Sequence, residues 1–254
     1  ELGREARELP DAGGGQLRLR LGGPELALGG LELLSADYGD GSALYKLQVP
    51  QAPVLLTLRV GFSNEETPQL SAELLNTGQE ALRVEADFPA LGPLRLSEDL
   101  ADDWYLYPKR GTVLSNRPVN LRTPHGGLFK LQFMDLYSAD RGGGIYVMTD
   151  DLEGRYGYFY LDKDDAGTEM GVQYQCVDLP PGEKVTLPSV VIGAHNGDWH
   201  VALAAYRSWV HSWYKPMVPR KQWFREVFSF RQGRLRGGLL DFDARKYQFD
   251  DFIE

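Results

Sequence analysis

Carboxylate side chains occur in close groups at four places along the chain. These are Asp102 with Asp103, Asp150 with Asp151, Asp162 with Asp164 and Asp165, and Asp241 with Asp243. Hydrolysis of a glycosidic bond needs two carboxyl groups held about 5 to 9 Å apart across a sugar-binding cleft. Adjacency in the sequence does not supply that geometry, and exposed loops explain such groups equally well. The sequence therefore assigns no carboxylate to catalysis.

The histidine, cysteine and serine residues give little indication of a metal site or of a catalytic nucleophile. The four histidines, His125, His195, His200 and His211, show no metal-ligand spacing, and the acidic run near Asp162 lacks the glycine and glutamate spacing of a helix-loop-helix calcium site. The single cysteine, Cys176, has no internal disulfide partner and lies in a strand-like run. No serine sits in a G-x-S-x-G elbow. We expect no metal, no cofactor and no catalytic residue.

Aromatic residues are the strongest chemical signal. Sugars present apolar C–H faces that stack on aromatic rings, while their hydroxyl groups bind charged or amide side chains. The run around Asp103–Gly111 offers both, so we predict substrate contacts from Trp104, Tyr107 and Arg110. Tyr156, Tyr158 and Tyr160 alternate along another strand, where packing is the alternative explanation. Trp199, Trp209 and Trp213 share a helical stripe and are expected to pack.

Composition narrows the classes of partner. The 254 residues include 27 basic and 36 acidic side chains, a net charge of -9, which repels phosphate backbones and anionic lipid. No apolar run approaches the ~18 residues that a membrane-spanning helix needs. We therefore expect neither a nucleic-acid partner nor a membrane partner, and the cellular compartment stays open.

The elements that would position these side chains are mainly strands. Short alternating or apolar runs bounded by glycine and proline recur along the chain, which is typical of stacked antiparallel sheets. They are Gln16–Leu21, Ala43–Val49, Val54–Val60, Leu70–Leu75, Ala81–Phe88, Gly127–Met134, Gly144–Thr149, Gly157–Leu161, Gly171–Asp178 and Val185–Ile192. We expect residues 70–75 and 81–88 to form a hairpin around Asn76–Gly78, and Gly142–Gly144 to make a hairpin turn.

The pattern changes at Gly197. Asp198 is a good helix N-cap, and apolar residues then recur every three or four positions, which predicts a helix from Trp199 to about Tyr214. Pro216 and Pro219 follow as a linker toward a strand candidate, Trp223–Phe230. Beyond it, residues 231–254 look like a loop and the first turn of a helix, as in a βα unit that is cut short.

Four stretches together resemble a bacterial family of sandwich-then-barrel proteins that is distantly similar to α-galactosidases. They are Ala86–Leu91, Asp103–Gly111, Gly197–Trp209 and Trp223–Phe230. In that family the N-terminal region is a galactose-mutarotase-like supersandwich. The resemblance implies that residues 227–230 form the first strand of a (β/α) barrel, and that the catalytic carboxylates lie on later barrel strands outside this chain.

The sequence and the resemblance together predict a mainly β protein, an antiparallel β-sandwich followed by one linker helix and the start of a barrel. The expected division is a flexible terminus at 1–15, the sandwich at 16–196, the helix and linker at 197–219, and an incomplete barrel at 220–254. The expected role is an accessory domain of a glycoside hydrolase, with carbohydrate and the missing barrel as partners. A stand-alone carbohydrate-binding module, a mutarotase-type enzyme and a structural domain that self-associates are the alternatives.

Overall fold

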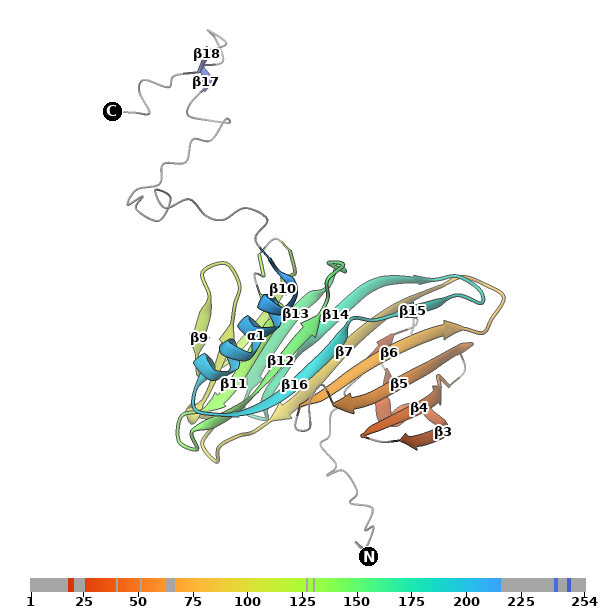
Figure 1. The fold of residues 1–254 in the computed structure, drawn as a ribbon, viewed down its shortest axis with the longest axis horizontal. Coiled ribbons are helices and arrows are strands. Elements are labelled where there is room, and N and C mark those ends of the chain that lie inside the picture. The colour runs from red at the N-terminus through yellow and green to blue at the C-terminus, as the bar shows by residue number, and fades with distance from the viewer. Residues whose placement is uncertain are drawn as a thin grey trace, which may run out of the picture. The chain divides into compact units, whose positions relative to one another are not determined.

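The computed structural model describes residues 18–20, 26–39, 41–50, 52–62, 67–126, 128–129, 131–215, 240–241 and 246–247. The chain divides into two units, Glu1–Val210 and His211–Glu254. The first unit contains two antiparallel sheets and most of one α-helix (Figure 1). In the second unit, Leu240–Asp241 (β17) pairs with Lys246–Tyr247 (β18). The other residues of the region 220–254, where a barrel start was predicted, lie outside the described residues, including the strand candidate at 223–230.

The larger sheet has ten strands. In spatial order they are β3 (Glu32–Gly39), β4 (Ser42–Gln48), β5 (Val54–Phe62), β6 (Pro68–Asn76), β16 (Ser189–Asn196), β12 (Gly143–Asp150), β11 (Phe133–Ser138), β8 (Asp103–Tyr107) and β9 (Val113–Ser115), with β15 (Lys184–Thr186) also paired to β6. All the pairs are antiparallel. The turn at Gly142 joins β11 to β12 as a hairpin, as predicted.

The smaller sheet has six strands. Their order is β10 (Val119–Pro124), β13 (Tyr158–Asp164), β14 (Gly167–Leu179), β7 (Leu82–Leu94), β1 (Arg18–Arg20) and β2 (Leu26–Ala27). Two 3-10 turns, η1 (Leu28–Gly30) and η2 (Leu100–Asp102), complete the first unit. The antiparallel, sandwich-like architecture expected from the sequence is therefore confirmed.

The main hydrophobic core lies between the two sheets. Alternate residues of strands from both sheets point into it, as the two-residue period of a strand requires. Its centre is aromatic: Phe129 stacks on Phe159 with ring centroids 4.1 Å apart, and Tyr107 meets Phe129 edge-on at 4.8 Å. Burial of this apolar surface is the main force that holds the sheets together.

The hairpin predicted around Asn76–Gly78 is wrong. β6 pairs with β5, β15 and β16, whereas β7 pairs with β1 and β14, so this turn carries the chain from one sheet to the other. Asn76 is fully buried at the crossing, and its side-chain amide donates to the carbonyl oxygens of Glu80 and Leu179. Its side-chain oxygen accepts from the Gly78 amide, so the crossing satisfies every polar atom of this side chain.

Two further strand predictions need correction. The run expected at 127–134 becomes β11 only at Phe133. The single strand expected at 185–192 is two strands, β15 and β16, because Pro188 lacks the amide hydrogen that a continuous ladder needs. Sequence patterns also missed β3, whose side chains are largely exposed and do not alternate in burial.

The helix is close to its prediction. α1 spans Trp199–Trp213, and Oδ1 of Asp198 accepts a hydrogen bond from the His200 amide at 3.0 Å, as an N-cap should. Ala202 and Tyr206 are buried, and Trp199 and Trp209 pack beside them. Trp213, expected to pack, is instead 46% exposed. In the part of the chain that the structure describes, no helix has the length and hydropathy needed to cross a lipid bilayer.

Candidate functional site

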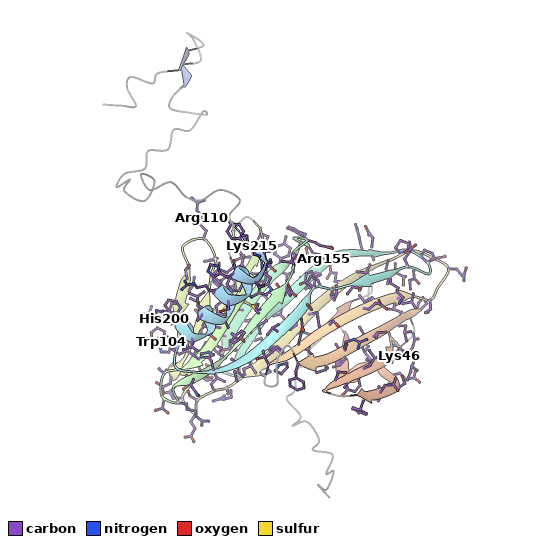
Figure 2. All side chains as sticks on the ribbon, in the orientation of Figure 1. Lys46, Trp104, Arg110, Arg155, His200 and Lys215 are labelled. Carbon is purple, nitrogen blue, oxygen red and sulfur yellow. The ribbon has the colours of Figure 1, made fainter. Side chains whose placement is uncertain are left out.

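The structure does not bring the three predicted sugar-contact residues together. Trp104 and Tyr107 both belong to β8 but occupy positions of opposite parity, so their side chains leave opposite faces of the sheet. Arg110 lies in the exposed turn after the strand. Figure 2 shows Trp104 and Arg110 well apart. A single sugar ring could not contact all three side chains.

Tyr107 is a core residue. Its side chain is fully buried, and its hydroxyl donates to the carbonyl oxygen of Phe159 at 2.7 Å, which links β8 to the opposite sheet. Burial raises the pKa of Tyr107 to about 12. The predicted substrate contact from Tyr107 is therefore corrected to a structural role, because aromatic residues at period two point inward as readily as outward.

Hydrogen bonds from buried side chains hold the segment before Trp104. Lys163 of β13 is almost fully buried, and its ammonium group donates to the carbonyl oxygens of Leu100, at 2.7 Å, and Asp103. The carboxylate of Asp103 accepts from the Leu96 amide at 2.9 Å. Burial lowers the pKa of Lys163. These bonds fix the chain where it enters β8 and so fix the position of Trp104.

Sequence reasoning missed a buried pair on the helix-covered face of the larger sheet. Nε2 of His195, on β16, lies 3.0 Å from Oδ1 of Asp135, on β11, with side-chain exposures of 3% and 0%. Strand β12 lies between them: Asp135 is opposite Tyr146, and His195 is opposite Gly144. We call Asp135 and His195 the junction pair, because β16 leads directly into α1 (Figure 1).

Glycines make the room that the junction pair occupies. A Cβ atom at Gly144 would lie 2.6 Å from Nε2 of His195 and would also collide with the carbonyl oxygen of Leu136. A Cβ atom at Gly193 would overlap the ring of Tyr146. Glycine at these two strand positions therefore lets an imidazole and a phenol ring lie flat against the sheet.

Desolvation dominates the electrostatics of the junction pair. Burial raises the pKa of Asp135 to about 6, against the opposing attraction of His195, and the nearby charge of Asp198 adds to the rise. Oδ2 of Asp135 and Nδ1 of His195 are buried without a hydrogen-bond partner among the described residues. With so little exposure, the junction pair cannot contact a substrate.

Hydrogen bonds of Trp209 and Tyr206 fix α1 to this face. The indole N–H of Trp209 donates to Oδ1 of Asp150 at 3.0 Å, and the Tyr206 hydroxyl accepts from the Gln132 amide at 3.2 Å. At the start of the helix, Asp198 also pairs with the imidazole of His200 at 2.9 Å. The carboxylates at Asp150 and Asp198 therefore serve the helix rather than a reaction. Across the described ranges, no three His, Cys, Asp or Glu side chains gather as a metal-binding group.

Comparison with known sequences found no matching family model and no matching curated protein. Solved structures do match. The α-N-acetylgalactosaminidase NagBb from Bifidobacterium bifidum, solved with GalNAc, is 12% identical with a TM-score of 0.57, and the match covers 78% of this chain and 33% of that chain. The α-galactosidase from Lactobacillus brevis is 12% identical with a TM-score of 0.53, over 83% of this chain and 32% of that chain.

A third match is the GH36 α-galactosidase AgaB from Geobacillus stearothermophilus, 13% identical with a TM-score of 0.50, over 72% of this chain and 30% of that chain. This chain thus spans about a third of the length of these enzymes. At sequence identities this low, a structural match shows a shared fold and nothing about function. The expected resemblance is confirmed at that level: the chain has the fold of the N-terminal sandwich region of α-galactosidases and α-N-acetylgalactosaminidases.

Proposed function

We propose that this chain is the sandwich region of a larger glycoside hydrolase-like protein and that it braces a catalytic (β/α) barrel that follows it. The supporting observation is the partial coverage of the matched enzymes: 78% of this chain aligns with 33% of the NagBb chain. In that arrangement, residues 16–196 form the sandwich, 197–219 connect it, and 220–254 begin the barrel.

The contacts of α1 suit this bracing role. Trp209 and Tyr206 bind side-chain and main-chain groups of the larger sheet, and the junction pair is buried at the strand that leads into the helix. Their combined effect is to hold the helix at a defined position on the sandwich. A domain that follows such a helix starts from a rigid support instead of a flexible linker.

The proposal also includes a direct contact between this chain and a carbohydrate substrate. Trp104 is half-buried on the helix-covered face and Arg110 is exposed in a turn, so each could reach a substrate held by another domain. Tyr107 is left out because it belongs to the core. Association of two copies of the chain is a separate prediction, which sedimentation of the natural gene product tests.

Hydrolysis assays on the natural gene product test the proposal. We expect turnover of nitrophenyl α-galactoside or α-N-acetylgalactosaminide by the complete gene product and none by the isolated 254-residue chain. Equal turnover by the isolated chain would place the catalytic groups within the sandwich and overturn the proposal. Absence of turnover by the complete product on any nitrophenyl glycoside would also count against it.

A further inference from the structure

The outward face of the six-stranded sheet carries polar and aromatic residues in register. Inward positions of β13, such as Phe159 and Leu161, belong to the core, so the alternate positions Tyr158 and Tyr160 face away from it. One row crosses four successive strands, from Tyr158 on β13 through Gln173 on β14 and Asp87 on β7 to Arg18 on β1.

Arg18 and Tyr160 organise this face. One guanidinium nitrogen of Arg18 donates to the Tyr160 hydroxyl at 2.7 Å and to Glu169 at 3.3 Å, and Nε lies 3.7 Å from Asp87. Tyr160 reaches Arg18 because Gly171 has no side chain: a Cβ atom there would lie 2.5 Å from the Tyr160 hydroxyl. Burial raises the pKa of Tyr160, so it stays a neutral phenol.

An aromatic rim adjoins the charged network. The guanidinium carbon of Arg122 lies 5.0 Å from the centre of the Tyr158 ring. Tyr156 donates its hydroxyl hydrogen to Tyr158 at 2.8 Å and stands edge-on to it, with centroids 5.4 Å apart. Tyr156 is 56% exposed, so much of its ring is open to solvent.

We propose that this outer platform, made of Arg18, Asp87, Arg122, Tyr158, Tyr160 and Glu169 with Tyr156 at its rim, binds a neutral saccharide. The two guanidinium and two carboxylate groups of the platform balance in charge, and Asp162, directly opposite Glu169 on the neighbouring strand, adds a negative charge, so this face does not favour an anionic ligand. It offers ionised donors and acceptors beside aromatic rings, the combination that hydroxyl groups and C–H faces of a sugar need.

The side chains of this network are also preorganised for binding. Asp87 and Gln173 are 8% and 5% exposed although they belong to an outward-facing row, so their polar atoms are held in place by neighbours rather than by bulk water. Ion pairs that are partly desolvated in this way contribute little net stability. Their fixed orientation instead reduces the side-chain entropy that the protein would lose on binding a polyol.

The inference takes its ligand class from the proposed function but uses no residue of the barrel or of the Trp104 segment. Its failure is therefore distinguishable: the complete gene product can hydrolyse glycosides without this platform, and this chain can bind sugar without being part of a hydrolase. The two claims have separate assays, turnover for the first and binding by the 254-residue chain for the second.

The test is titration of the 254-residue chain by saturation-transfer NMR and calorimetry with raffinose, maltotriose, N-acetylgalactosamine and glucose 6-phosphate. We expect at least one of the three neutral sugars to bind, and Tyr156→Ala or Glu169→Gln to weaken that binding at least tenfold. Tyr38→Ala is the matched control, because Tyr38 is 75% exposed and stands edge-on to Tyr45 on the other sheet. That variant should bind as the parent does.

Four results would overturn the proposal. They are no binding of any neutral sugar, binding that survives both Tyr156→Ala and Glu169→Gln, an equal loss in Tyr38→Ala, and tighter binding of glucose 6-phosphate than of the neutral sugars. Near-ultraviolet circular dichroism of each variant checks that it is folded. Unfolding is not expected, since Tyr156 is largely exposed and the Glu169 side chain is 40% exposed.

Discussion

His195 and Asp135, 60 residues apart in the sequence, form a hydrogen-bonded pair of 3.0 Å that is almost completely buried on the face covered by α1. Removing one member of such a pair leaves the other buried and unpaired, which destabilises a fold by several kcal/mol in typical cases, about 3 to 5. The pair therefore ties the stability of the larger sheet to the strand that leads into the helix.

Asp135→Asn should change how stability depends on pH. Burial raises the pKa of Asp135 to about 6 in the folded protein, above its ordinary value of 3.8, so between these values the folded protein binds the proton that the unfolded protein releases. The contribution of Asp135 is thus most favourable below about pH 4 and is lost as pH rises through 6. Urea unfolding from pH 4.5 to 7.5 should show the variant gaining stability relative to the parent as pH rises; a constant difference would contradict this assignment.

Gly144→Ala should destabilise the protein by about 2 to 4 kcal/mol, because the added methyl group meets the His195 imidazole and the Leu136 carbonyl oxygen. Gly30→Ala is the matched control, since nothing lies within 4 Å of a Cβ atom at that position. Its effect should stay within about 1 kcal/mol. Equal unfolding midpoints for the two variants in urea would show that Gly144 makes no special room.

Asp198→Ala should lower the free energy of unfolding by about 1 kcal/mol through loss of the cap on the His200 amide. Asp198→Asn keeps an oxygen acceptor at the same place and should retain most of the stability. Thermal unfolding followed at the helical circular dichroism band distinguishes them. If both substitutions had the same effect, charge and not capping would be the contribution of this side chain.

Tyr107→Phe should cost about 1 kcal/mol of stability, because it removes the hydrogen bond to Phe159 without changing the ring packing. Sugar affinity and turnover in the complete gene product should not change. Trp104→Ala in the same product is the contrasting variant, and a fall in its sugar affinity would support a cleft contribution from β8. A fall for Tyr107→Phe instead would contradict the core assignment.

Local patterns predicted the parts of the fold that depend on neighbouring residues. The helix from Trp199 follows from the Asp198 cap and a three-to-four apolar spacing, both readable within a few positions. The turn at Gly142 is similar, because a glycine with positive φ closes a hairpin between adjacent strands. These elements matched the structure to within a residue or two.

The rest of the fold depends on pairing between strands that are far apart in the sequence. Nothing near Asn76 indicates that its two flanking strands enter different sheets, because that choice depends on β14 and β16, more than 90 residues later. The junction pair is likewise assembled only by the register of β11, β12 and β16. The one local signal was glycine within otherwise apolar strands, at Gly144 and Gly193, which marks a close approach of side chains.

The intact mass of the natural gene product, measured from its own host, tests whether a catalytic barrel follows the sandwich. We expect a mass well above 28.5 kDa, by at least the ~250 residues that a barrel needs. A mass close to 28.5 kDa would contradict it, because the sandwich would then have no catalytic domain to brace.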